Sequence, residues 1–343
     1  MEHHVAQLAT GLAQSGDEVT VVTHRLDRAH PLVEESDVVV RRFPLTVATP
    51  DYRYSMALSG FLRQSRGAFD VVHVQSYHTL VGVNALLAGI DRLIFTPHYH
   101  GTGHTRFRAL LHKPYRLVGR RVVDRSAVII CVSQAEAQLF RSDFPAAQRV
   151  HVIPNGASAP APSPEAVHSC PVTDDDVVTI GRLETYKRND LLIEALTRLS
   201  PPTRLVVVGE GPARPELERR AAELDVRDRV LFLGRVSRDA LDAVLARAPV
   251  VASASEHEAF GLSVADGIAA GARVVASDLP SHREVLRLTD NAAAVLVDRD
   301  ADSLAKALRE ALVLGRPRDR STLPSWAEIT ARTRQLYALV GAA

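Results

Sequence analysis

One stretch of the chain, Glu256–Asp278, carries carboxylates and glycines in an order that suits a ligand rich in oxygen atoms. Glu258 begins a loop, and Gly261 permits an unusual backbone conformation there. A helix that opens directly after it would direct unpaired N–H groups at a phosphate or sugar oxygen. The carboxylates of Glu258 and Asp266 can accept hydrogen bonds from hydroxyls. Alone, the pattern also fits a Glu258 that only stabilises the start of a helix through the helix dipole.

A second candidate is the loop Thr96–Gly101, TPHYHG, which follows an apolar run. The histidines at 98, 100 and 104 could suggest a metal site. Fewer than four ligands are evident, and residues 92–123 contain no carboxylate to complete them. We therefore expect no metal here.

The elements that must position these residues alternate between short apolar runs and amphipathic stretches. In the first half, the runs that read as buried strands are Glu18–Thr23, Val38–Phe43, Asp70–Val74, Leu93–Phe95, Ala127–Val132 and Val150–Ile153. In the second half they are Val177–Ile180, Leu205–Val208, Val230–Leu233, Val250–Ala252, Val274–Ala276 and Ala294–Val297. Near-continuous apolar strands separated by helices indicate parallel sheets covered on both faces, so we expect an α/β fold.

The middle of the chain divides this pattern. Residues 156–171, GASAPAPSPEAVHSCP, are rich in Ala, Pro and Ser and show no periodicity, which is typical of a linker. We predict one domain over residues 1–155 and another over 172–324, followed by a helix within 325–343. The length of 343 residues suggests the same number of domains.

Composition excludes several classes of protein. The chain contains no run of eighteen apolar residues and no signal-peptide layout at its start, so we expect a cytoplasmic protein without a transmembrane helix. Two cysteines, Cys131 and Cys170, cannot form a disulfide framework. A net charge of +1 argues against nucleic-acid binding. Of the 41 basic residues only three are lysines, namely Lys113, Lys187 and Lys306.

Several short motifs together resemble glycosyltransferase family 4, whose members are retaining enzymes of the GT-B fold. The stretch from Glu256 resembles the E-x7-E signature of that family. The other matching pieces are Gly181-Arg182-Leu183 followed by Lys187, Val208–Pro212 (VGEGP), Phe232–Gly234 (FLG), Ile153–Gly156 (IPNG) and Asp278–Glu284 (DLPSHRE). Each piece is weak, but their order and spacing over most of the chain are specific. The resemblance implies two Rossmann-like domains facing a cleft, with the C-terminal helix 325–343 returning to the first domain.

The resemblance implies that Arg182 and Lys187 neutralise the diphosphate of a nucleotide-sugar donor. The diphosphate gains negative charge as the glycosidic bond breaks, so fixed cations stabilise the transition state more than the ground state. The alternative is a solvated strand-to-helix loop beside Arg188 and Asp190.

The remaining implied donor contacts involve a carboxylate pair and backbone groups. Glu258 would hold hydroxyls of the donor sugar, and the second carboxylate would hold the ribose. Position 266 departs from the family because it is Asp rather than Glu. Its reach is shorter by about 1.5 Å, so a ribose contact could become water-mediated. Further donor-binding residues implied are Gly209, Gly234, Arg235, Phe260, Gly261 and Leu262.

On the acceptor side, the resemblance maps a family histidine onto His98. A retaining front-face displacement needs no protein nucleophile, so His98 would position groups or stabilise charge on the sugar. Glu2, His78 and His100 are the other residues expected near the acceptor. His73 and His78 flank a strand end, where packing is at least as good a reading as acceptor contact. No cofactor or metal is implied, because the nucleotide sugar is a substrate.

The start of the sequence differs from the family pattern. His3–Ser15 reads as an amphipathic helix, but no strand precedes it. In the family, this helix follows a first strand and a Gly-Gly loop that ends in Glu, which Glu2 matches. A missing central strand would remove about four buried side chains at roughly 1.5–3 kcal/mol each. Because this rivals a net stability of ~5–15 kcal/mol, we expect the native chain to start upstream. The alternative is a degenerate paralogue without catalysis.

Residues 106–125 form a basic stretch of six arginines and one lysine with interspersed apolar residues. A basic amphipathic helix can lie peripherally on an anionic membrane or contact an acidic acceptor. A solvated helix face explains the same pattern, and we favour that reading.

We therefore predict a retaining glycosyltransferase that moves a sugar from a nucleotide-diphosphate donor to a natural product, lipid, glycan or small metabolite. A GT-B sugar-nucleotide epimerase and a non-catalytic nucleotide-sugar binder are the alternatives. An NAD oxidoreductase is disfavoured, because Gly209-x-Gly211 lacks the third glycine of the dinucleotide motif. The sequence does not specify the donor base, the donor sugar or the oligomeric state.

Overall fold

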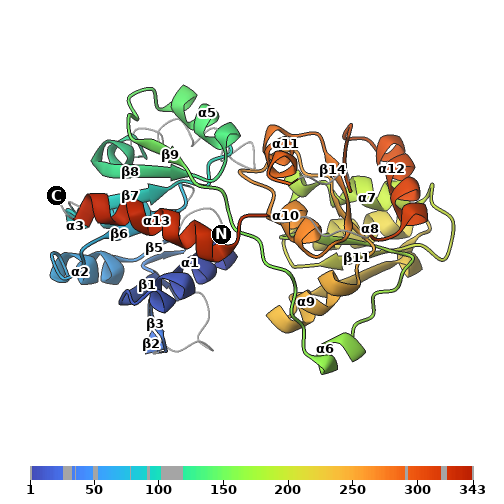
Figure 1. Cartoon of the computed structure of the whole chain (residues 1–343), viewed down its shortest axis with the longest axis horizontal. Coiled ribbons are helices and arrows are strands. Elements are labelled where there is room, and N and C mark those ends of the chain that lie inside the picture. The colour runs from blue at the N-terminus through green and yellow to red at the C-terminus, as the bar shows by residue number, and fades with distance from the viewer. Residues whose placement is uncertain are drawn as a thin grey trace. The chain divides into compact units, whose positions relative to one another are not determined.

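The computed structural model describes residues 2–25, 33–34, 36–48, 53–77, 79–90, 93–101, 119–289, 293–317 and 323–341. Contacts divide the chain into two compact units. One comprises Met1–Gly156 and Ser325–Ala343, and the other comprises Ala157–Pro324. The final helix therefore belongs to the same unit as the start of the chain (Figure 1).

The first unit is α/β, with one parallel sheet, one mixed sheet and a small hairpin. Its elements are α1 (Glu2–Gln14), β1 (Val19–His24), β2 (Val33–Glu34), β3 (Val38–Phe43), β4 (Val47–Ala48), β5 (Arg53–Tyr54), α2 (Met56–Gln64), β6 (Val72–Gln75), α3 (Val81–Ala88), β7 (Leu93–Thr96), β8 (Ser126–Cys131), α5 (Gln134–Asp143), β9 (Val150–Val152) and α13 (Trp326–Gly341). One sheet has the order β1-β3-β2 and the other β6-β7-β8-β9. Within the described residues, β1 and β6 are therefore edge strands of separate sheets. Helix α13 packs against α1 (Figure 1).

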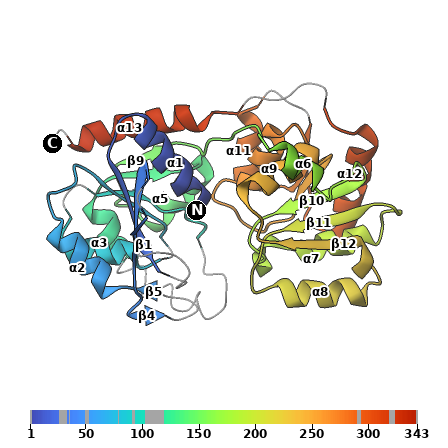
Figure 2. The ribbon, with the colours of Figure 1, turned by 90° about the horizontal axis from the view of Figure 1, so that it is seen from below.

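The second unit is a doubly wound parallel sheet. Its elements are α6 (Pro164–His168), β10 (Asp176–Ile180), the 3-10 turn η1 (Thr185–Lys187), α7 (Asn189–Leu196), β11 (Arg204–Val208), α8 (Arg214–Glu223), η2 (Arg227–Arg229), β12 (Val230–Gly234), α9 (Arg238–Arg247), β13 (Val250–Ser253), α10 (Leu262–Ala269), β14 (Arg273–Ser277), α11 (Pro280–Arg287), β15 (Ala294–Val297) and α12 (Ala301–Leu314). The sheet order is β12-β11-β10-β13-β14-β15. Helices α8 and α9 lie on opposite sides of β11 and β12 (Figure 2).

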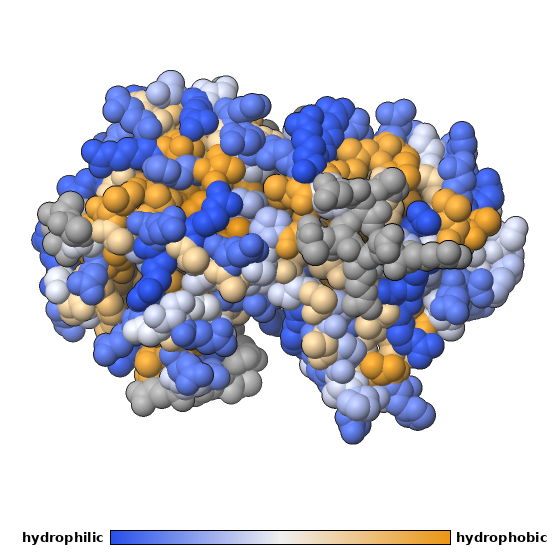
Figure 3. Space-filling model, viewed as in Figure 1, coloured by the Kyte–Doolittle hydropathy of each residue, from blue (hydrophilic) through white to orange (hydrophobic). Residues whose placement is uncertain are grey.

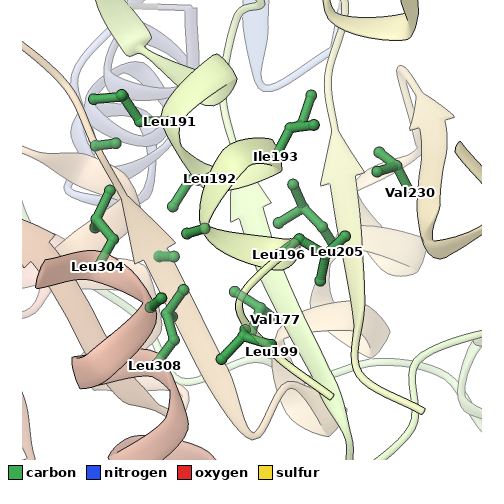
Figure 4. Packing of buried hydrophobic residues seen from close by; sticks show 14 of the residues in the cluster. Val177, Leu191, Leu192, Ile193, Leu196, Leu199, Leu205, Val230, Leu304 and Leu308 are labelled. Atoms are coloured by element: carbon green, nitrogen blue, oxygen red, sulfur yellow. The ribbon is translucent and has the colours of Figure 1, made fainter. Parts of the chain in front are cut away.

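The core of the second unit forms where α7 and α12 cover the central strands. Leu192 and Leu196 of α7 meet Leu205 of β11 and Leu308 of α12, and all four side chains are buried (Figure 4). Burial of each such side chain contributes roughly 1.5–3 kcal/mol. The packing fixes the strands whose ends carry the candidate residues.

The stretch 156–171 is more ordered than its composition predicts. It contains the short helix α6, which begins with Pro164 and is capped by the Ser163 hydroxyl. Ser163 also binds the carboxylate of Asp239 at the start of α9, at 2.6 Å and 2.7 Å. A Ser-Pro pair is itself a helix-start signal, which explains the short helix in a segment of linker composition.

The described surface mixes apolar and polar residues, as Figure 3 shows on one face. None of the helices in the described ranges combines the length and the apolar character that a membrane crossing requires. Of the basic stretch 106–125, the structure describes residues 119–125, which are helical. The remainder lies outside the described residues.

Candidate active site

The candidate donor residues lie where the direction of strand addition in the second unit reverses. Strands β10 and β13 are parallel neighbours, and the sheet grows from β10 towards β12 and from β13 towards β15. Ligands of open α/β sheets bind outside the carboxyl ends of the strands at such a switch point. Lys187 follows β10 and Glu258 follows β13, so both reach this position.

Lys187 and Glu258 form an ion pair at the switch point. Lys187 Nζ lies 2.5 Å from Glu258 Oε1, and the two side chains are only 17% and 14% exposed. The Ser255 hydroxyl donates a hydrogen bond of 2.8 Å to the same carboxylate oxygen. The structure thus brings together two of the residues that the sequence predicted to bind the donor.

Both members of this pair stay charged at neutral pH. Burial disfavours each charge, but the opposite charge and the shared hydrogen bond outweigh it. The pKa of Glu258 is lowered, and the pKa of Lys187 is raised. A cation and an anion are therefore held, poorly hydrated, at one edge of the sheet. The cation suits the phosphates of a ligand, and the carboxylate suits its hydroxyls.

The loop after Glu258 presents the start of α10. Gly261 is the N-cap residue with φ +99°, and no side chain caps the helix. A Cβ at this glycine would lie 2.6 Å from Cδ2 of the His282 ring, so only glycine fits. Leu262, the first residue of α10, and the buried Phe260 flank this turn. An uncapped helix start offers backbone N–H groups to an anion or a sugar oxygen.

Neighbouring strand ends are tied together by backbone contacts. The Gly209 N–H donates to the Gly234 carbonyl at 2.8 Å, and the Gly181 N–H donates to the Val208 carbonyl at 3.0 Å. A Cβ at Gly209 would lie 2.0 Å from the Gly181 carbonyl oxygen. These glycines therefore let the backbone turns approach closely at the ends of β10, β11 and β12.

The other predicted donor residues are less tightly placed. Arg182 is 76% exposed and pairs with Glu184 at 2.7 Å, so it does not join the buried pair. Arg235 is exposed just beyond β12. Asp266 lies on α10, where burial raises its pKa to about 6, partly offset by the charge of Arg238. The charges of Arg238 and Asp242 on α9 influence the pKa of Asp266. Its contact with a ribose stays a prediction.

His98, in the first unit, occupies a strained backbone position. It has φ +47°, which is uncommon for a residue other than glycine and is concentrated at functional sites. His98 Nε2 lies 2.9 Å from Gln75 Oε1, and the ring meets that of His4 edge to face at 4.9 Å. Burial lowers the pKa of His98 well below its ordinary value. The imidazole is therefore neutral at physiological pH.

The loop that carries His98 is anchored by a buried carboxylate. Glu136 Oε1 accepts from the Tyr99 N–H and Glu136 Oε2 accepts from the Val132 N–H, both at 2.5 Å. Burial raises the pKa of Glu136 to about 8, although both backbone hydrogen bonds oppose this shift. The Glu136 side chain therefore connects the end of β8 to the loop that follows β7 through two hydrogen bonds.

The remaining acceptor-side predictions have mixed outcomes. Glu2 is the exposed first residue of α1, and His100 is half-buried in the loop after β7. His78 lies outside the described residues. Across the parts of the chain that the structure describes, no group of three or more His, Cys, Asp or Glu side chains could hold a metal ion.

The sequence analysis did not single out three residues near the candidate site, namely Gln75, His282 and Tyr337. His282, in the middle of the DLPSHRE stretch, donates from Nδ1 to the Ser277 carbonyl at 2.8 Å and packs under Gly261. Gln75 is hydrogen-bonded to His98, and His73 links Gln75 to Tyr337. The alternation of His73 and Gln75 along one strand was a usable signal, since residues two apart share a face. No sequence signal pointed to Tyr337.

Solved structures place this architecture in the GT-B class. Sucrose-phosphate synthase from Thermosynechococcus elongatus matches with a TM-score of 0.79 at 22% identity, over 99% of this chain and 93% of that one. Anabaena Alr3699/HepE, in complex with UDP and glucose, matches with a TM-score of 0.70 at 18% identity, over 98% and 91%. At these identities the likeness establishes the fold.

Sequence comparison gives the family. Residues 1–159 match the model of Glycosyltransferase Family 4, and residues 165–322 match that of Glycosyl transferases group 1. A D-inositol 3-phosphate glycosyltransferase from Xylanimonas cellulosilytica is 30% identical, over 98% of this chain and 91% of its own length. The chain belongs to glycosyltransferase family 4 and is a glycosyltransferase, so the predicted family, fold class and enzyme class are confirmed.

Proposed function

We propose that the protein transfers a glycosyl unit, with retention, from a nucleotide-diphosphate sugar to a hydroxyl of an acceptor. The ion pair between Lys187 and Glu258 at the switch point carries this proposal. A cation for the diphosphate, a carboxylate for sugar hydroxyls and an uncapped helix start for backbone contacts all lie within one loop region of the second unit.

The chemistry follows from how the pair would separate when the donor binds. Lys187 would exchange the Glu258 carboxylate for a phosphate oxygen, and Glu258 would accept from sugar hydroxyls. The acceptor hydroxyl attacks the anomeric carbon on the face from which the diphosphate leaves, and its proton passes to the departing phosphate oxygen. Lys187 stabilises the charge that grows on that phosphate, which is electrostatic catalysis.

The first unit would supply the acceptor side. His98 is neutral and its backbone is strained, which suits a group that orients a hydroxyl rather than one that stores charge. A UDP-sugar is the first donor to test, because HepE was solved with UDP. An inositol phosphate is the first acceptor to test, because the Xylanimonas relative is named for one.

A thermal-shift screen against UDP-, GDP-, ADP- and dTDP-sugars, followed by product analysis with and without acceptor, tests the proposal. We expect stabilisation by one donor class and a product with the anomeric configuration of the donor. Lys187→Ala and Glu258→Ala should abolish transfer, whereas the exposed control Arg219→Ala on α8 should not. An altered sugar nucleotide without acceptor would indicate an epimerase. Stabilisation without turnover would indicate a non-catalytic binder.

A further inference from the structure

A chain of hydrogen bonds leads from the last helix to His98. Tyr337 on α13 lies 2.6 Å from His73 Nδ1, and His73 Nε2 lies 2.8 Å from the Thr96 hydroxyl. Gln75 spans the next gap, with its Nε2 3.2 Å from His73 Nε2 and its Oε1 2.9 Å from His98 Nε2. All of these residues belong to the first unit.

With Oε1 of the Gln75 amide facing His98 and its Nε2 facing His73, the donors and acceptors of this hydrogen-bond network assign the positions of the protons. An amide N–H₂ can only donate, so the Gln75 amide nitrogen requires a lone pair on His73 Nε2. His73 then carries its proton on Nδ1 and donates it to the Tyr337 oxygen. On the other side, the Gln75 carbonyl oxygen can only accept, so the His98 proton lies on Nε2. His98 Nδ1 is left with a lone pair.

The proton assignment requires that the imidazoles of His73 and His98 are both neutral, and their burial favours this state. Burial lowers the pKa of His73 to about 3 and that of His98 well below its ordinary value. A single proton per ring therefore has two alternative positions, and only the hydrogen-bond partners select between them.

We propose that Gln75, His73 and Tyr337 are positioning residues that hold His98 as the Nε2–H tautomer, so that its Nδ1 accepts a hydrogen bond from a substrate hydroxyl. The proposal rests on the proposed function for the identity of that hydroxyl, which belongs to the sugar or to the acceptor alcohol. The tautomer itself is a property of the protein without substrate.

Substitutions at Gln75 and at Tyr337 are expected to have different effects on this hydrogen-bond network. Gln75→Met keeps the side-chain length but removes both hydrogen bonds, so His98 should populate both tautomers. Tyr337→Phe removes the acceptor for His73 Nδ1–H. His73 should then move its proton to Nε2 and donate to Thr96, the Gln75 amide should reverse, and the His98 proton should move to Nδ1. Tyr337 thus acts on a residue to which no hydrogen bond joins it directly.

Long-range ¹H–¹⁵N spectra of the full chain with ¹⁵N-labelled histidine test this directly. A His98→Gln variant identifies the His98 signals among those of the 14 histidines. We expect the Nε2–H pattern in the wild type, a mixture in Gln75→Met, and a shift towards Nδ1–H in Tyr337→Phe. The matched control Tyr54→Phe removes a tyrosine hydroxyl that binds Ser59, and should leave His98 unchanged.

Kinetics supply the second readout. Gln75→Met should lower kcat on the order of tenfold while the donor KM changes less than twofold, because the misoriented group acts in the transition state. A wild-type His98 in the Nδ1–H form would overturn the inference, as would unchanged His98 signals in both variants. Absence of turnover in the wild type would instead overturn the proposed function, and the spectra would still decide the tautomer.

Discussion

Tyr337 and His73 are 264 residues apart in the sequence, yet the tyrosine oxygen lies 2.6 Å from the imidazole Nδ1. Their rings meet edge to face, with centroids 5.6 Å apart. The final helix is therefore an integral part of the first unit, because it provides a polar contact to strand β6 in addition to its packing on α1.

We predict that the ion pair in the second unit behaves as a coupled unit. Lys187→Met leaves the Glu258 charge buried without its partner, which should lower the free energy of unfolding by about 3–5 kcal/mol. The double variant Lys187→Met/Glu258→Gln should be more stable than Lys187→Met alone, because no bare charge remains. Hydrogen exchange of the β10 and β13 amides measures both. Additive effects of the two substitutions would contradict direct coupling.

The Gly261 turn should tolerate no side chain. Gly261→Ala places a methyl group 2.6 Å from the His282 ring at a residue with φ +99°, so we expect lower stability and loss of donor-induced thermal stabilisation. Gly315→Ala is the matched control. It also has a positive φ, +60°, but no atom lies within 4 Å of the added Cβ. Its loss of stability reports backbone strain without a steric clash.

The double variant Gly261→Ala/His282→Ala separates clash from strain. Removal of the ring should restore part of the stability that Gly261→Ala loses. If it restores none, the imidazole does not define the turn.

Glu136 should be required for its two acceptor oxygens. Glu136→Gln replaces one acceptor oxygen with an N–H₂ group that faces a backbone N–H of either Tyr99 or Val132. We expect the thermal midpoint to fall, with a cost of about 1–3 kcal/mol for the unsatisfied buried groups. Trp326 is the only tryptophan in the chain and lies in the first unit, so its fluorescence follows this unit selectively. An unchanged transition would contradict the anchoring role.

The first unit should lose stability in mild acid. Burial lowers the pKa of His4 from 6.5 to about 4. Between those values the unfolded chain binds a proton that the folded chain does not, so stability falls as pH falls from about 7 to 4. The contribution of His4 is on the order of 3 kcal/mol.

His4→Asn should flatten this pH dependence. The amide can still donate to Asn155, which His4 Nδ1 approaches at 2.7 Å, but it cannot titrate. Denaturation followed by Trp326 fluorescence at pH 7 and pH 4.5 measures the difference. Equal slopes in the wild type and the variant would rule out His4 as a source.

The sequence predicted the proximity of Lys187 and Glu258 better than the surroundings of His98, for a physical reason. Lys187 and Glu258 each follow an apolar strand, and the motif order aligns those strands at the carboxyl edge of one parallel sheet. Local patterns therefore sufficed to bring the two residues together. The burial of their ion pair was not predictable, because the same sequence pattern is also compatible with two charges that are hydrated separately.

The surroundings of His98 were not predictable from local patterns. Tyr337 occupies a helix whose periodicity shows only which face is buried, and nothing in the sequence indicates that its hydroxyl meets His73. Helix α6 was missed for a different reason. The composition of residues 156–171 masked a five-residue helix that begins at Pro164.

The two connections between the units lie side by side. The Ala157 N–H donates to the Pro324 carbonyl at 3.0 Å, so the second unit begins and ends at almost the same point. In topological terms, the second unit is an insertion in the first. Joining Gly156 directly to Ser325 would give a first unit with a continuous backbone. Under the proposed function, chimaeras of two relatives cut at these junctions should keep the acceptor of the relative that supplies the first unit and take the donor of the relative that supplies the second.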